Sequence, residues 1–161
     1  MTKRILLWLN AFFACGYFIG HLFDYLVIIP NWRNSNVEGI TKFREFFIVA
    51  DPGAFFMIFV MAPILFALIC FFSYFKSEKR LKMMLGIYLV IALGAFIFTM
   101  VYFLPLNDYL FWSKEINFEP VKTKEFISKW ILGDTIRLVI GLAALLVSAR
   151  ALHLAYEVDK K

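Results

Sequence analysis

Four long apolar blocks, separated by short polar segments, make up most of the chain. Each block has about the 20 residues that a helix needs to cross a hydrocarbon layer roughly 30 Å thick. The pattern therefore predicts an all-α fold in which four transmembrane helices pack as an up-down-up-down bundle. We expect one integral-membrane domain, residues 1–161, with spans at about 5–29, 54–75, 81–106 and 130–156.

The first block is longer than the apolar part of a secretory signal peptide. It starts with Lys3 and Arg4, as signal peptides do, but its apolar run continues to Ile29. The apolar core of a signal peptide has only about 7–15 residues. We therefore expect a membrane span that ends at Pro30, because proline interrupts the hydrogen bonds of a helix.

Residues 36–50, between the first two spans, are predicted to form a short amphipathic helix. Its apolar face carries Ile40, Phe43, Phe46 and Phe47, and charged residues lie on the other side. Helices of this kind lie in the membrane interface. The helix either anchors the chain at this surface or acts as a lid over the opening of the bundle.

Composition and charge agree with a membrane location. The chain is 62% apolar, whereas soluble domains are about 45–50% apolar. Lys and Arg are more frequent on the side that carries both termini, and the short loop Lys76–Lys82 holds four of them. Because cytoplasmic loops are rich in Lys and Arg, we expect a multi-pass protein with both termini in the cytoplasm. The net charge of +5 then reflects contact with a lipid bilayer and not with nucleic acid.

The first span carries its glycines and its polar residues on nearly the same face. Gly16 and Gly20 form a small-xxx-small pattern, which lets helices approach closely. Tyr17, His21 and Asp24 form the neighbouring row. We expect both rows to point into the bundle.

The fourth span contains an acid and a base three residues apart, Asp134 and Arg137. A charged side chain at this depth costs at least about 2.5–3.5 kcal/mol, so it normally faces the bundle interior, is paired and has a function. Gly141, Ala144 and Ser148 continue the same stripe. This stripe is therefore predicted to face the other helices.

Packing the four spans side by side gathers polar residues at the outer end of the bundle. Asp51, which precedes Pro52, and Asp108 also fit helix ends, where they need no further role. The candidate catalytic residues are His21, Asp24, Asn107, Asp134 and Arg137, and the candidate substrate-binding residues are Tyr17, Tyr102 and Trp130.

The residue types at this end leave several chemistries open. His21 with Asp24, Asp51 or Asp134 offers ligands for a divalent metal, and His21 alone offers an axial ligand for haem. His21 can instead serve as a general base, with Arg137 stabilising an oxyanion and no cofactor required. The structural alternative is an ionic network that only holds the helices together. The sequence contains no HExxH, P-loop or GxGxxG motif.

Short motifs near the ends of the spans resemble those of the anthrone-oxygenase-like family of small four-helix membrane proteins. The resemblance rests on Pro105-Leu106-Asn107 at the end of the third span, on Trp130 followed by Arg137, and on Gly16 and Gly20. It implies that Asn107 and Arg137 are signature polar residues and that Trp130 lies at the rim of the site. It also implies the oxidation of anthrones to quinones by molecular oxygen without a classical cofactor.

These inferences favour a membrane oxidoreductase or oxygenase acting on a lipophilic substrate, polycyclic aromatic or quinone-like, at a polar site in the outer half of the bundle. The alternative is a non-catalytic protein, either a lipophile-binding module or a small accessory subunit. In that case a second copy or another membrane protein would be its partner.

Overall fold

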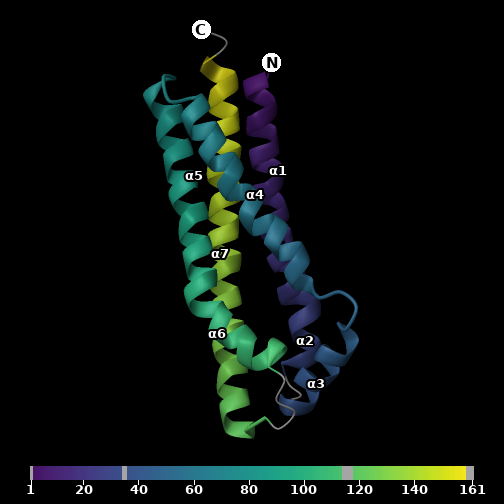
Figure 1. Cartoon of the computed structure of the whole chain (residues 1–161). Helices are drawn as coiled ribbons and strands as arrows, with labels where there is room; N and C mark the ends of the chain where they lie inside the picture. Colours follow the sequence, from purple (N-terminus) through teal and green to yellow (C-terminus); the bar gives the residue numbers. More distant parts are fainter. Residues whose placement is uncertain (1, 34–35, 114–117, 159–161) are drawn as a thin grey trace.

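The structure, a computed structural model, describes residues 2–33, 36–113 and 118–158. Within these residues the chain is helical and contains no strand, which confirms the all-α prediction. Figure 1 shows long helices packed side by side in a bundle, with both termini at the same end. Four stretches are long and apolar enough to cross a membrane: Lys3–Trp32, Pro52–Ser73, Lys79–Trp112 and Pro120–Glu157.

Two of these stretches are composite helices. The first consists of α1 (Thr2–Phe23), the π-helical turn η1 (Asp24–Ile28) and α2 (Ile29–Trp32). The third consists of α5 (Lys79–Phe98), η2 (Thr99–Phe103), α6 (Leu104–Asn107) and η3 (Asp108–Trp112). The second and fourth stretches are the continuous helices α4 (Pro52–Ser73) and α7 (Pro120–Val158).

The prediction that Pro30 ends the first helix is wrong, because a π-helical turn lets the helix continue through it. The Ile29 N–H, just before this proline, donates to the carbonyl oxygen of Asp24, five residues back. The third stretch has the same kind of π-helical turn before Pro105, where the Leu104 N–H donates to the Thr99 carbonyl oxygen. A π turn adds a residue to the helical turn and so avoids the clash between a proline ring and the preceding turn.

The four long helices form a closed ring of contacts. α1 packs against α4 and α7, and α5 packs against the same two helices. Gly141 of α7 permits close contact with α1, since a Cβ there would lie 3.2 Å from the Cα of Phe18. Gly16 and Gly20 instead make room for aromatic rings of α4, because a Cβ at Gly16 would lie 2.0 Å from the Phe59 ring.

The end of the bundle opposite the termini is closed by aromatic and aliphatic side chains. The short helix α3 (Asn36–Phe46) packs there against α2, α7 and η3, as Figure 1 also shows for α2. Ile40 of α3 is fully buried, and the Phe43 ring contacts Trp32. The predicted apolar face is therefore only partly buried, because Phe46 on the same helix is 80% exposed.

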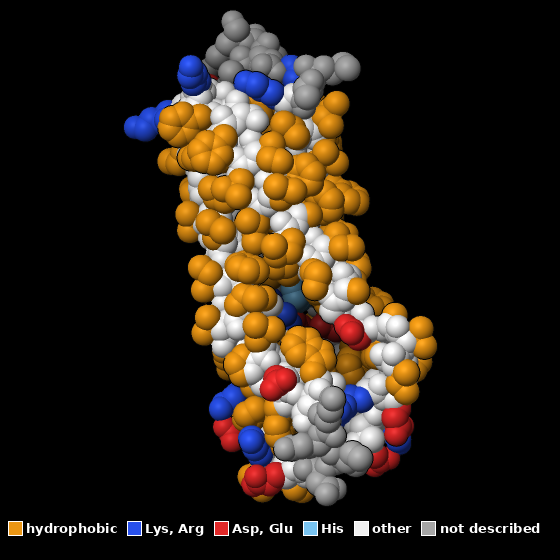
Figure 2. All heavy atoms as spheres, viewed as in Figure 1, with side chains coloured by type: hydrophobic (Ala, Val, Ile, Leu, Met, Phe, Trp, Pro, Cys, Tyr) orange, Lys and Arg blue, Asp and Glu red, His pale blue; other side chains and the backbone are white. Residues whose placement is uncertain are grey.

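The long helices present a wide apolar surface. Side chains such as Val90 and Val139 are 70% and 65% exposed. Figure 2 shows apolar atoms covering the middle of the bundle and charged atoms gathered toward its two ends. Such a surface is stable in lipid and not in water, so the chain is an integral membrane protein.

Candidate functional site

The candidate site lies where α1 and α7 face each other. His21 and Asp24 are three residues apart, and so are Asp134 and Arg137, so each pair points from one face of its helix. The close contact at Gly141 brings the two faces together. We call these four residues the ionic cluster; their exposures are 0% for His21 and Asp134, 5% for Asp24 and 6% for Arg137.

Asp134 is the centre of the ionic cluster. Its Oδ1 accepts a hydrogen bond from Arg137 Nη2 at 2.9 Å and lies 2.9 Å from His21 Nδ1. An ionised carboxylate only accepts hydrogen bonds, so Nδ1 carries the hydrogen of a neutral His21 and Nε2 keeps its lone pair. Asp134 therefore sets both the tautomer of the imidazole and the position of the guanidinium.

Asp24 is the fourth member of the ionic cluster, but its side chain is not bonded to the other three. Its side chain makes no hydrogen bond or ion pair with any residue that the structure describes. One ligand atom each of His21, Asp24 and Asp134 lie within 4.8 Å of one another, so these three residues could hold a metal ion. Imidazole with two carboxylates suits Zn²⁺, Fe²⁺ or Mn²⁺. Because Arg137 places its positive charge on Asp134 Oδ1, it opposes a cation there.

Asp51 is not part of this metal-ligating group. It is the N-cap residue of α4, where its side chain accepts a hydrogen bond from the Gly53 N–H. The helix-end interpretation of Asp51 is therefore confirmed, and the metal alternative reduces to His21, Asp24 and Asp134.

Aromatic rings enclose the ionic cluster. The guanidinium carbon of Arg137 lies 3.4 Å from the centroid of the Phe103 ring and 5.3 Å from that of Trp130. His21 lies between Tyr17, with ring centroids 4.5 Å apart, and Phe56, at 4.8 Å and nearly parallel. The sequence analysis missed Phe56 and Phe103, since nothing distinguishes them among the 20 phenylalanines of the chain.

The other candidates lie beside the ionic cluster or away from it. Trp130 Nε1 donates to Asn107 Oδ1 at 2.8 Å, so Asn107 is linked to Arg137 through the Trp130 ring. The Tyr102 hydroxyl donates to the backbone oxygen of Lys129 at 2.8 Å. The structure thus brings four of the five candidate catalytic residues together and places Asn107 behind Trp130.

Several polar atoms at the ionic cluster have no partner among the described residues. They are His21 Nε2, Asp134 Oδ2, Arg137 Nε and the hydroxyl of Tyr17, and all are buried. Buried polar atoms are nearly always hydrogen-bonded to protein or to water. The site therefore has a lone pair, a carboxylate oxygen and a guanidinium N–H available to a ligand.

Comparisons with known proteins identify the family. The family model described as anthrone oxygenase matches residues 46–147, a segment that includes Asn107, Trp130, Asp134 and Arg137 but not His21 or Asp24. No curated protein and no solved structure matched the chain. Because the match covers more than half of the 161 residues and the helices are long and apolar enough to cross a membrane, this chain is a membrane protein of the anthrone oxygenase family.

Proposed function

We propose that this protein is a membrane oxygenase that oxidises a flat, lipophilic ketone or phenol of the anthrone type at the ionic cluster. The observation that carries the proposal is the buried His21–Asp134–Arg137 network, in which a lone pair and a guanidinium N–H have no protein partner. A base and a cationic donor side by side are what the removal of a proton from a carbon conjugated with a carbonyl requires.

The first step is proton transfer. An anthrone has an acidic methylene carbon across the ring from its ketone. His21 Nε2 accepts a proton from this carbon, and the electron pair moves to the ketone oxygen. Asp134 stabilises the imidazolium through Nδ1–H, and Arg137 stabilises the oxyanion.

The second step is reaction of the electron-rich carbon with molecular oxygen. One oxygen atom becomes the new carbonyl of the quinone. The other leaves as water, which takes up the two hydrogens of the former methylene. Asp24, which has no partner in the cluster, is placed to hold one of these protons during the exchange.

Access from the lipid side supports a lipophilic substrate. Figure 2 shows a hollow below the middle of one face of the bundle, with histidine, basic and acidic atoms visible between apolar ones. Asp24 and Arg137 are the members of the ionic cluster with measurable exposure. A flat aromatic molecule dissolved in the bilayer can enter there, with Tyr17, Trp130 and Tyr102 as the proposed binding residues.

The test is oxygen consumption by the protein in detergent or nanodiscs with anthrone as the probe. We expect His21→Gln to lower kcat by about 10²–10⁴ and Arg137→Gln by about 10²–10³, the usual effects of losing a base and an oxyanion donor. His153→Gln and Arg150→Gln are matched controls, since both residues are exposed and lie near the other end of α7.

Full activity in both cluster variants would contradict the proposal. A wild-type protein that retains lipophilic molecules but consumes no oxygen would instead favour the non-catalytic alternative. An accessory subunit would be revealed by a second membrane protein that purifies with it in a fixed ratio.

A further inference from the structure

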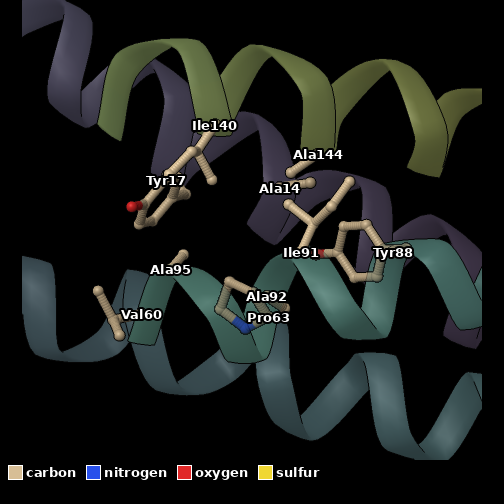
Figure 3. A pocket seen from close by; sticks show the side chains of 10 residues that line it. All are labelled: Ala14, Tyr17, Val60, Pro63, Tyr88, Ile91, Ala92, Ala95, Ile140 and Ala144. Carbon is tan, nitrogen blue, oxygen red and sulfur yellow. The ribbon is translucent and has the colours of Figure 1, made fainter. Parts of the chain in front are cut away.

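A cavity lies between the four long helices, directly beside the ionic cluster. Four alanines from three helices, Ala14, Ala92, Ala95 and Ala144, leave the space that larger side chains would fill. Figure 3 shows Tyr17 at one end of the lining and Tyr88 at the other. The remaining lining residues are aliphatic.

The cavity is too narrow for a polycyclic substrate. Its empty space is about 310 Å³ with the open mouth included, but the interior has room for only about one or two water-sized molecules. Pockets that enclose a drug-sized ligand have volumes of about 300–1,000 Å³. The occupant must therefore be small.

The apolar part of the lining, between two tyrosines, disfavours water. A buried water needs about two to four polar partners. The two tyrosine hydroxyls are the polar side-chain groups of the lining, and neither has a partner among the described residues, so each can hold a water only at its own end. Figure 3 shows them at opposite ends, with the Tyr17 hydroxyl directed away from Tyr88. Apolar cavities stay dry and bind apolar guests such as xenon.

One side chain, that of Tyr17, separates the cavity from the ionic cluster. Tyr17 lines the cavity, and the same ring contacts His21 with 4.5 Å between ring centroids. A rotation of Tyr17 would connect the two spaces. A small apolar molecule in the cavity is therefore one side chain away from the atoms that we propose to react.

From these observations we infer that the cavity is a binding site for molecular oxygen, which it delivers past Tyr17 to the ionic cluster. The inference rests on the proposed function, in which oxygen is the second substrate. Dioxygen is small and apolar, and it dissolves better in hydrocarbon than in water, so it enters such a cavity from the bilayer. The lipophilic substrate and the gas would then reach the cluster by separate routes.

The experiment combines xenon binding with oxygen kinetics. Xenon is the probe of the cavity, followed by ¹²⁹Xe NMR of the protein in detergent. Ala144→Leu fills the cavity from α7, and Ala143→Leu is the matched control, because Ala143 is the exposed neighbour of buried Ala144. Ile140→Ala enlarges the cavity and tests the opposite direction if the filled variant does not fold.

We expect wild-type protein and Ala143→Leu to bind xenon, Ala144→Leu to lose the bound signal and Ile140→Ala to strengthen it. In the oxygen assay, Ala144→Leu should raise the KM for oxygen severalfold and leave the KM for anthrone unchanged. Ile140→Ala should not raise the KM for oxygen.

Two results would overturn the inference while leaving the proposed function intact. They are the absence of xenon binding in an active wild-type protein, and loss of xenon binding in Ala144→Leu without a change in the KM for oxygen. A wild-type protein that binds xenon but consumes no oxygen contradicts the proposed function, and it removes oxygen as the occupant of the cavity.

Discussion

Replacing Asp134 by asparagine tests whether the ionic cluster is a catalytic site or only a link between helices. The substitution keeps the shape of the side chain and removes its charge. Arg137, 6% exposed and bonded to Asp134 Oδ1 at 2.9 Å, would then be a buried cation without its counter-ion. Breaking a buried ion pair in this way costs about 3–5 kcal/mol.

The aromatic rings around Arg137 should offset part of this loss of stability. The guanidinium lies over the Phe103 ring at 3.4 Å, and a desolvated cation–π contact contributes about 2 kcal/mol. We therefore expect Asp134→Asn to lower the free energy of unfolding by about 3 kcal/mol, near the lower limit of that range. At about 2–4 °C per kcal/mol for a chain of this length, the thermal midpoint in detergent should fall by roughly 6–12 °C.

The double variant Asp134→Asn with Arg137→Gln separates structure from catalysis. Both members of the pair are then neutral and can still form a hydrogen bond, so a coupling of about 0.5–3 kcal/mol should restore much of the stability. The kcat for anthrone should stay about 10²–10³-fold below that of the wild type or lower, because the oxyanion donor is missing. The assay is thermal unfolding followed in parallel with oxygen consumption. A double variant that regains activity together with stability would refute the catalytic role of the cluster.

Three further predictions, the first with a matched control, concern the ionic cluster and the packing around it. Gly133→Ala should destabilise the protein by about 1–3 kcal/mol, because the new Cβ would lie 2.4 Å from the Tyr102 ring. Gly94→Ala, with nothing within 4 Å of its Cβ, should be neutral or stabilising in the same thermal assay. Asn107→Leu removes the acceptor of the Trp130 Nε1–H and should cost about 1–3 kcal/mol; a kcat as low as that of a His21 variant would show that Asn107 contacts substrate. Activity should survive removal of divalent cations by a chelator, because the positive charge of Arg137 beside Asp134 repels a cation; loss of activity that is restored by Zn²⁺, Fe²⁺ or Mn²⁺ would instead support the metal alternative.

The sequence by itself determined the class of protein and the general position of its site. Hydrophobic blocks of membrane-spanning length predict helices, since backbone polar groups have no other way to be satisfied in lipid. Asp134 and Arg137 are noticeable for the same reason, as ions in a solvent that does not stabilise them. The family also followed from short motifs, and the comparison with known families confirmed it.

Only the tertiary structure decided how the polar residues are arranged. His21 and Asp134 are 113 residues apart, and their contact depends on how α1 and α7 rotate and approach at Gly141. Helical spacing predicts which residues share a face, but it does not predict which faces of two helices meet.

The course of the helices and their aromatic contacts also required the structure. The π turn before Pro30 carries the first helix past the residue at which the proline pattern predicted its end. Phe103 contacts Arg137 and Phe56 contacts His21, although neither residue differs in sequence from the phenylalanines that face outward. Apolar side chains pack in lipid and in protein with similar energy, so hydrophobicity predicts that a residue lies in the membrane but not which neighbour it touches.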